Sequence, residues 1–224
     1  MSIAQTYRSI RDEVPSSVTI VLAGKTRTPE EILEAIDAGA TDIGQNYVQE
    51  AVAVYEALGE KAKSVRWHML GTLQKNKINQ ALPVFDVIQT VESVEKAIDI
   101  DKRARSIGKR QPVYVEINIG SEVTKAGLEP RYEMVENAVR EIAGLENISV
   151  EGLMTMGPRV GDPEDNRSHF RKTKEIFDRI RDLQLPNVNM QTLSMGMSNS
   201  YRVAIEEGAN MVRLGTVVFG ERDY

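Results

Sequence analysis

Lys25 is the residue of this sequence best placed to act as a nucleophile. It follows the apolar run Val18–Ala23 and precedes Thr28-Pro29-Glu30-Glu31, a helix start with a threonine cap and a glutamate three residues later. A lysine held at such a strand end, partly shielded from water, has a lowered pKa and can attack an aldehyde. An ordinary solvated lysine is the alternative, and position alone leaves both open.

Small and hydroxyl residues in two late loops could bind a phosphate. Residues 194–198 read Ser-Met-Gly-Met-Ser, and residues 214–216 read Leu-Gly-Thr. Backbone N–H groups at a helix start bind anions, and glycine lets a phosphate approach closely. Two ordinary glycine turns are the alternative, but the pair together favours phosphate binding. The string Ala23-Gly24-Lys25-Thr26 also resembles a nucleotide-binding P-loop, but the first glycine of that motif would fall at Thr19, which excludes it.

Arg213 lies within a short apolar run, Met211–Leu214. A buried guanidinium left without a polar partner is costly, so Arg213 must point at something polar. A salt bridge to Glu116 or Glu151 would satisfy it, and so would a ligand. Position alone does not separate the two.

Three further polar residues fall in or just after predicted strands. His68 alternates with apolar neighbours, which favours a hydrogen-bonded histidine in the core. Asn46 and Asn118 follow strands, where position alone favours a turn-forming role over a ligand contact.

The composition excludes several kinds of chemistry. The 224 residues carry a formal charge of −5, no cysteine and two histidines. Disulfides, thiolate catalysis and cysteine or histidine metal sites are therefore not expected, which leaves only a carboxylate-bound magnesium open. The charge argues against nucleic acid as a partner. Residues 1–14 lack the apolar core of a signal peptide, and no apolar run approaches the roughly 20 residues of a membrane span. We therefore expect a cytoplasmic protein that does not bind a membrane.

Short apolar runs alternate with longer amphipathic segments, which predicts βα units and a parallel sheet. The predicted strands are Val18–Ala23, Asp42–Gln45, Arg66–Leu70, Val87–Thr90, Val113–Asn118, Val150–Met154, Asn189–Leu193 and Met211–Leu214. The predicted helices are Glu30–Ala38, Val48–Leu58, Val94–Ile107, Tyr132–Ile142 and Ser168–Leu183. Eight strands without a linker predict one domain over residues 1–224, a single (β/α)8 TIM-type barrel with an extra N-terminal helix over residues 1–13. An open sheet with an edge strand is the alternative.

Several longer strings resemble the pyridoxal-phosphate homeostasis protein family, whose fold is similar to the barrel of alanine racemase. They run in the same order from about residue 18 to the C-terminus. The strings are Ala23–Thr26, Gly44–Glu50, Trp67–Lys77, Gly152–Gly157, Leu193–Ser198, Val212–Gly215 and Phe219–Tyr224. The chain departs from the residues common in the family at Gly24, Gln45 and Thr72, and after Lys125.

The resemblance implies a cofactor site for pyridoxal 5′-phosphate. Lys25 would carry the cofactor as a lysine aldimine, and Arg213 would face the pyridine nitrogen. The phosphate would be held by Ser194, Ser198, Gly215 and Thr216. The ring would be lined by Asn46, His68 and Met154. The implied function is intracellular pyridoxal-phosphate homeostasis without robust catalysis, with apo-enzymes as candidate recipients, and we expect a monomer.

A pyridoxal-phosphate-dependent amino-acid racemase is the alternative function. Barrel racemases of the alanine type use a second, β-rich domain that supplies a tyrosine base. Here the barrel accounts for the chain up to Tyr224, so we expect that domain to be absent. An arginine at the ring nitrogen also weakens the ring as an electron sink, although alanine racemase tolerates the same arginine. A barrel enzyme acting on another phosphorylated metabolite, with Lys25 as its Schiff-base amine, is a weaker third interpretation.

Overall fold

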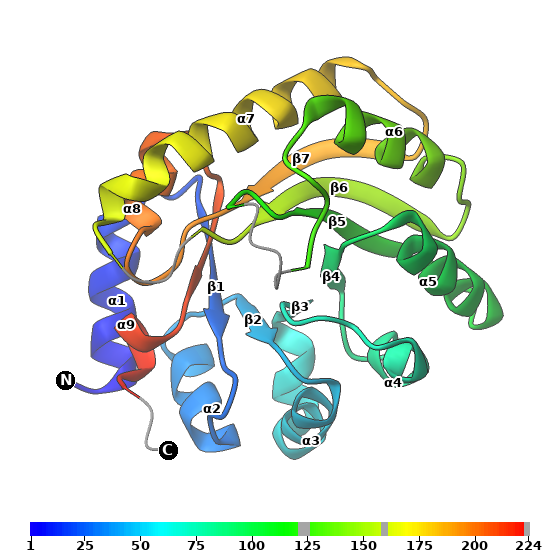
Figure 1. The fold of residues 1–224 in the computed structure, drawn as a ribbon. Helices are drawn as coiled ribbons and strands as arrows, with labels where there is room; N and C mark the ends of the chain where they lie inside the picture. Colours follow the sequence, from blue (N-terminus) through cyan, green and yellow to red (C-terminus); the bar gives the residue numbers. More distant parts are fainter. Residues whose placement is uncertain (121–125, 158–160, 222–224) are drawn as a thin grey trace.

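Eight parallel strands close into a barrel in sequence order, β1 to β8, in the computed structural model (Figure 1). The structure describes residues 1–120, 126–157 and 161–221. The strands are β1 Thr19–Ala23, β2 Asp42–Gln45, β3 Arg66–Met69, β4 Val87–Val91, β5 Gln111–Ile117, β6 Ile148–Thr155, β7 Val188–Ser194 and β8 Met211–Leu214. The predicted barrel is confirmed, and the open sheet is excluded because β1 pairs with β8 as well as with β2.

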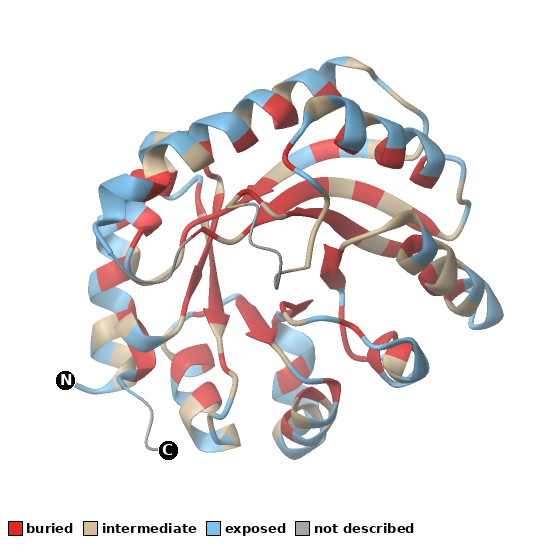
Figure 2. Cartoon of the chain, in the orientation of Figure 1, coloured by how far each residue is buried: buried red, intermediate tan, exposed pale blue. Residues whose placement is uncertain are grey.

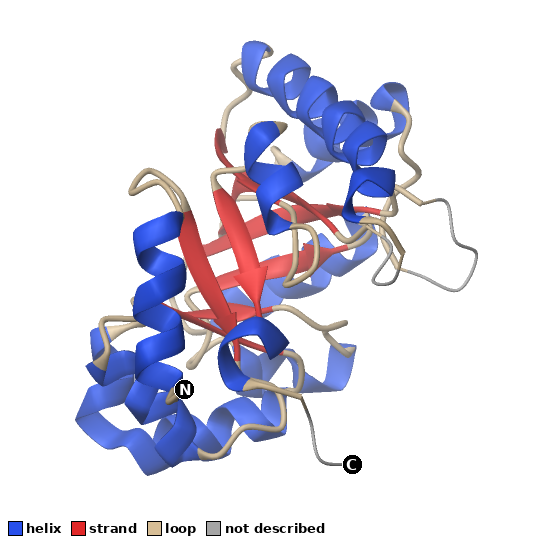
Figure 3. Ribbon diagram, turned by 90° about the vertical axis from the view of Figure 1, so that its left-hand side faces the viewer, coloured by secondary structure: helices blue, strands red, loops and turns tan. Residues whose placement is uncertain are grey.

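Helices surround the strands on the outside (Figure 3). They are α1 Ile3–Glu13, α2 Pro29–Asp37, α3 Val48–Leu58, α4 Ile78–Ala81, α5 Val94–Ser106, α6 Tyr132–Ile142, α7 Arg167–Asp182, α8 Tyr201–Glu206 and α9 Thr216–Phe219, with short 3-10 helices at Gly59–Ser64, Lys75–Lys77 and Pro163–Asn166. The extra N-terminal helix is confirmed as α1, which packs against α2 and α9. Among the described helices, none has the length and hydropathy to cross a membrane.

The predicted capping box begins α2. The Thr28 hydroxyl accepts a hydrogen bond from the Glu31 N–H at 3.3 Å, and the Glu31 carboxylate accepts one from the Thr28 N–H at 2.8 Å. The helix N-terminus thereby satisfies two backbone donors that would otherwise lack partners. Helices α4 and α9 were not predicted, because four residues are too few to show a helical periodicity.

Two apolar layers form the core. The larger lies between the strands and the helices, whose inward faces are buried while their outward faces are exposed (Figure 2). The smaller is made by side chains of the barrel interior: Val21, Leu70, Val87, Tyr114, Met154 and Met211. The same interior also buries polar side chains: Asp42, His68, Gln89, Ser194 and Arg213. A barrel interior is normally filled by branched apolar residues, so this polar content points to a special role for one end of the barrel.

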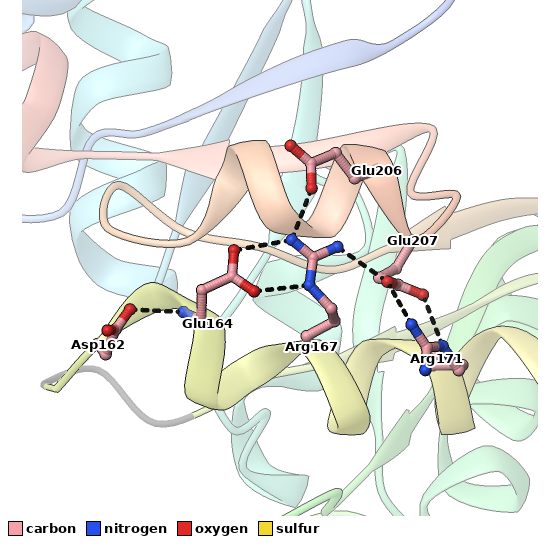
Figure 4. Close-up of polar contacts among 6 residues, drawn as sticks. All are labelled: Asp162, Glu164, Arg167, Arg171, Glu206 and Glu207. Carbon is pink, nitrogen blue, oxygen red and sulfur yellow. Dashed lines mark hydrogen bonds and ion pairs between the residues drawn. The ribbon is translucent and has the colours of Figure 1, made fainter.

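A cluster of charges ties α7 to α8 (Figure 4). The Arg167 guanidinium donates to the carboxylates of Glu164, Glu206 and Glu207 at 2.6–2.9 Å, and Arg171 also binds Glu207. Exposed pairs of this kind add little stability singly, but a shared arginine fixes geometry through its planar fork. The cluster therefore fixes the start of α7 against α8, the helix that follows the loop carrying Ser198.

Candidate functional site

A cavity of about 330 Å³ opens at the C-terminal ends of the strands, within the range of small-molecule sites. It is lined by residues from the ends of β1, β2, β3, β6, β7 and β8 and from the segment after α9. These residues are Ala23, Lys25, Asn46, Leu70, Met156, Met197, Ser198, Asn199, Arg213, Gly215, Thr216 and Glu221. This is the end at which (β/α)8 barrels carry their functional sites.

Six of the nine residues expected to bind a cofactor line this cavity: Lys25, Asn46, Ser198, Arg213, Gly215 and Thr216. The other three, His68, Met154 and Ser194, lie beneath it and are fully buried. Met154 belongs to the apolar interior of the barrel. The sequence alone does not distinguish residues that line a cavity from buried residues behind them, so all nine were predicted as one group.

The backbone around Lys25 is held on both sides. Before it, the Gln45 side-chain amide donates to the Gly24 carbonyl at 3.1 Å. After it, Thr26 has a φ of 64° and donates its N–H to the Glu50 carboxylate at 3.2 Å. A β-branched residue rarely adopts a positive φ, so this conformation persists only because its surroundings enforce it. The half-buried Lys25 side chain thus starts from a fixed position at the cavity wall.

Asn46 reaches the cavity because β2 and β3 approach each other closely at their ends. A Cβ atom on Gly71 would lie 2.2 Å from the carbonyl oxygen of Asn46. Only glycine fits there. Asn46 lies at a bend that follows β2 and lines the cavity.

Backbone N–H groups converge on one oxygen beside the cavity. The Ser198 hydroxyl oxygen accepts from the N–H groups of Gly215 at 3.1 Å and Val217 at 3.4 Å. The loop that carries Ser198 turns at Gly196, whose φ is +90° and where a Cβ would lie 2.5 Å from the Cβ of Ala204. The segment after β8 thus binds an oxygen atom of the other loop, and these are the two loops in which the sequence predicted phosphate binding.

Arg213 forms part of the cavity floor and is only 5% exposed. Its guanidinium donates to the Ser194 hydroxyl at 2.7 Å and to the backbone carbonyl of Thr155 at 2.7 Å. Burial lowers the pKa of Arg213 to about 10, with the charge of Glu116 acting in the opposite direction, so Arg213 stays protonated at neutral pH. Of the two carboxylates considered as salt-bridge partners, Glu116 interacts with Arg213 through its charge, while Glu151 accepts a hydrogen bond from Ser149. Both of these acceptors are neutral oxygens, and Arg213 itself lines the cavity, so a ligand there lies next to its positive charge.

His68 is a hydrogen-bonded histidine of the barrel interior, as its sequence position favoured. It bonds to Asp42 at 2.8 Å through Nε2 and to the Gln89 side-chain amide at 2.9 Å through Nδ1. Burial lowers the pKa of His68, and the neighbouring Asp42 only partly opposes this, so the imidazole is neutral near pH 7. The sequence analysis singled out neither Gln89 nor Asp42, although Gln89, a polar residue in the middle of the strand Val87–Val91, was a usable signal.

Other lining residues were also missed, notably Met156, Met197, Asn199 and Glu221. Most belong to the loops already singled out, so the loops were predicted and the individual contacts were not. Lys125 and the last three residues, 222–224, lie outside the described residues. Among the residues described, no group of three or more histidines or carboxylates could hold a metal ion.

The fold and the cavity define a barrel of the alanine racemase type with a ligand site at the C-terminal ends of its strands. The family model described as alanine racemase, N-terminal domain, matches residues 2–223. An alanine racemase of Clostridium difficile superposes with a TM-score of 0.79 at 18% identity, and the match covers 56% of that longer chain. At this identity the likeness shows a shared fold alone.

Nearer relatives are more specific. A pyridoxal phosphate homeostasis protein of Aquifex aeolicus is 42% identical over 202 residues, covering 90% of this chain and 86% of the relative. The solved structure of PipY from Synechococcus elongatus with PLP bound is 30% identical, has a TM-score of 0.87 and covers 97% of this chain and 100% of PipY. The chain belongs to the pyridoxal phosphate homeostasis protein family, as its motifs predicted.

Glu116 is a buried carboxyl group near the floor of the cavity. Burial, together with the charge of Glu92, raises the pKa of Glu116 to about 7, and Arg213 only partly opposes the rise. The folded state therefore binds a proton on Glu116 at pH values where the unfolded chain, with a pKa of 4.5, has lost it.

We expect the free energy of unfolding to fall as the pH rises from 4.5 to about 7, because over this range the unfolded chain has released the proton that Glu116 still binds in the folded state. The contribution is up to about 3 kcal/mol, at 1.36 kcal/mol per pKa unit. Glu116→Gln should remove this part of the pH dependence, measured by urea unfolding at several pH values. Glu151→Gln, on the neighbouring strand, should keep it. An unchanged pH profile in Glu116→Gln would contradict the raised pKa.

Proposed function

We propose that this protein binds pyridoxal 5′-phosphate, carries it on Lys25 as a Schiff base and serves pyridoxal-phosphate homeostasis without robust catalysis. The observation that carries the proposal is one shared cavity. A half-buried lysine, a buried arginine and the loops with convergent N–H donors all face it. The PLP-bound relative PipY, aligned over 97% of this chain, supports the choice of ligand.

The residues fit the three parts of the cofactor. The amine of Lys25 supplies a nucleophile for the aldehyde. The Gly215 and Val217 N–H groups, the Ser198 hydroxyl and Thr216 would supply donors for the phosphate. Arg213 and Asn46, which line the same cavity, would contact the pyridine nitrogen and the ring. Bound pyridoxal phosphate would supply a reactive aldehyde and an electron-accepting ring.

His68, Met154 and Ser194 take a different part in this proposal. Each is fully buried beneath the cavity, and Ser194 already receives a hydrogen bond from Arg213. We assign them to the support of the site, with Ser194 acting through Arg213.

Arg213 favours a carrier over a racemase. A guanidinium can donate hydrogen bonds but cannot accept them, so a ring nitrogen facing it keeps its lone pair. The positive charge also lowers the pKa of that nitrogen. An unprotonated ring is a weaker electron sink, which disfavours racemisation, although alanine racemase tolerates the same arginine. The protein then retains and releases its cofactor; we propose that it does so in the cytoplasm, as a monomer, with apo-enzymes as recipients.

Purified protein incubated with pyridoxal phosphate should show the absorption of a lysine Schiff base, and borohydride reduction should fix one adduct on Lys25. Lys25→Arg keeps a positive charge but lacks a nucleophilic amine, so it should lose the adduct. Lys75→Arg, at an exposed lysine paired with Asp99, should keep it. Peptide mapping by mass spectrometry locates the adduct, and a main adduct on another lysine would rule out Lys25 as the carrier.

Pyridoxal, which lacks the phosphate, should bind at least about 100-fold more weakly than pyridoxal phosphate. A phosphate accepts several charge-assisted hydrogen bonds, each worth about 1.5–3 kcal/mol. Ser198→Ala should reduce this difference in affinity, because it should weaken the binding of pyridoxal phosphate and not that of pyridoxal. Ser168→Ala, on the exposed face of α7, should leave both affinities unchanged. Equal affinity of the parent for both ligands, measured by absorbance titration, would exclude phosphate binding by the two loops.

Racemisation, transamination and decarboxylation of common amino acids by the loaded protein should stay near background. The unprotonated ring expected beside Arg213 is the physical reason. Chiral chromatography of reaction mixtures measures racemisation directly. A sustained rate of about 1 s⁻¹ or more, ordinary for an enzyme, would favour the racemase instead.

A further inference from the structure

A chain of buried hydrogen bonds crosses the barrel interior from Asp42 to Arg213. It joins side chains of five strands: Asp42 on β2, His68 on β3, Gln89 on β4, Ser194 on β7 and Arg213 on β8. Each link measures 2.7–2.9 Å, and no member is more than 5% exposed. Only Arg213 lines the cavity, so the other four members can influence a ligand only through it.

The two ends of this chain set the direction of every hydrogen bond within it. A guanidinium can only donate, so the Ser194 oxygen accepts from Arg213 and its hydroxyl proton is left to donate to the Gln89 carbonyl oxygen at 2.7 Å. At the other end a carboxylate can only accept, so His68 donates to Asp42 from Nε2. Burial would raise the pKa of Asp42, but the hydrogen bonds from His68 and Thr41, together with nearby charge that includes Arg66, lower that pKa, which keeps the carboxylate ionised.

Gln89 lies between His68 and Ser194, where the hydrogen-bond directions set by Asp42 and by Arg213 meet. A neutral His68 with its proton on Nε2 offers a lone pair on Nδ1, and Ser194 offers a proton. A primary amide satisfies both neighbours at once, because its NH2 donates to Nδ1 and its oxygen accepts from Ser194. The NH2 group also contacts the Met211 sulfur at 3.3 Å. If the amide were turned over, Ser194 would face two donors, the Gln89 NH2 group and Arg213. The amide oxygen would then face Nδ1, which would have to carry a proton. His68 would either present a lone pair on Nε2 to the Asp42 carboxylate or become a buried imidazolium, and both are costly.

We propose that Gln89 is a positioning residue for the cofactor site. It fixes the Ser194 hydroxyl with its lone pairs toward Arg213, and so holds the guanidinium at the cavity floor. The expected consequence, tighter binding of pyridoxal phosphate, rests on the proposed function. The direction of the hydrogen bonds does not depend on any ligand.

The direction is tested first, on the ligand-free protein. The chain has only two histidines, His68 and His169, so His169→Gln assigns the ring signals in a ¹⁵N NMR spectrum. We expect His68 to be neutral, with its proton on Nε2 and an accepting Nδ1. A proton on Nδ1 would mean that the Gln89 amide is turned over, and would overturn the proposal whether or not a cofactor binds.

The positioning effect is tested by a double-mutant cycle on the dissociation constant of pyridoxal phosphate. Gln89→Met, similar in length but unable to make either hydrogen bond, should weaken binding about threefold to tenfold, the effect of one hydrogen bond. In a Ser194→Ala background the same substitution should have no further effect, because Gln89 acts through Ser194.

Gln111→Met is the matched control. Gln111 is equally buried, on β5, and donates to the backbone carbonyls of Asp86 and Pro112, away from Arg213. The Gln111→Met variant should leave the dissociation constant of pyridoxal phosphate unchanged. An equal loss in both glutamine variants, or full additivity with Ser194→Ala, would overturn the positioning role. Failure of the parent to bind pyridoxal phosphate would instead refute the proposed function, and the His68 spectrum would then decide the inference by itself. If Gln89→Met does not fold, the direction measured in the parent remains the deciding result.

Discussion

The buried positive charge of Arg213 is the constraint on which the rest of the site depends. A guanidinium that is 5% exposed needs oxygen atoms around it, and the barrel supplies them from the Ser194 hydroxyl and the Thr155 carbonyl. The residues that surround Arg213 therefore make part of the barrel interior polar. The apolar filling of a typical barrel interior is correspondingly reduced to a small cluster around Tyr114 and Met154.

The closed barrel brings these groups together from distant parts of the chain. Lys25 follows the first strand and Arg213 lies on the last, and these two strands are hydrogen-bonded neighbours. Arg27 reinforces the same junction, because it donates to the carbonyl of Gly220 at 2.6 Å and lies over the ring of Phe219. The lysine and the loop after β8 therefore share one wall of the cavity, although 188 residues separate Lys25 from Arg213 in sequence.

Two of the departures from common family residues, Gly24 and Gln45, have a local explanation in the structure. Gly24 and Gln45, where serine and glutamate are common, form a matched pair. The Gln45 amide donates to the Gly24 carbonyl, a hydrogen bond that a carboxylate could not donate. A side chain on Gly24 would come within 3.0 Å of Ile32 and 3.3 Å of the Gln45 amide. The hydrogen bond between Gln45 and Gly24 holds the backbone beside Lys25, and the two departures leave Lys25 itself unchanged.

The sequence by itself determined the barrel, the family and the loops that surround the cavity. Alternating strands and amphipathic helices, the capping box at Thr28 and the glycines of the late loops are local features, and local physical rules are sufficient to interpret them. Tertiary structure alone decided which side chains reach the cavity. Ser194 and Ser198 are four residues apart in similar surroundings, yet one lies under Arg213 and the other beside the cavity. The reason is that strand register and barrel closure set the direction of each side chain, and both depend on pairing between strands far apart in sequence. The same dependence hid Gln89, whose partners are 21 and 105 residues away.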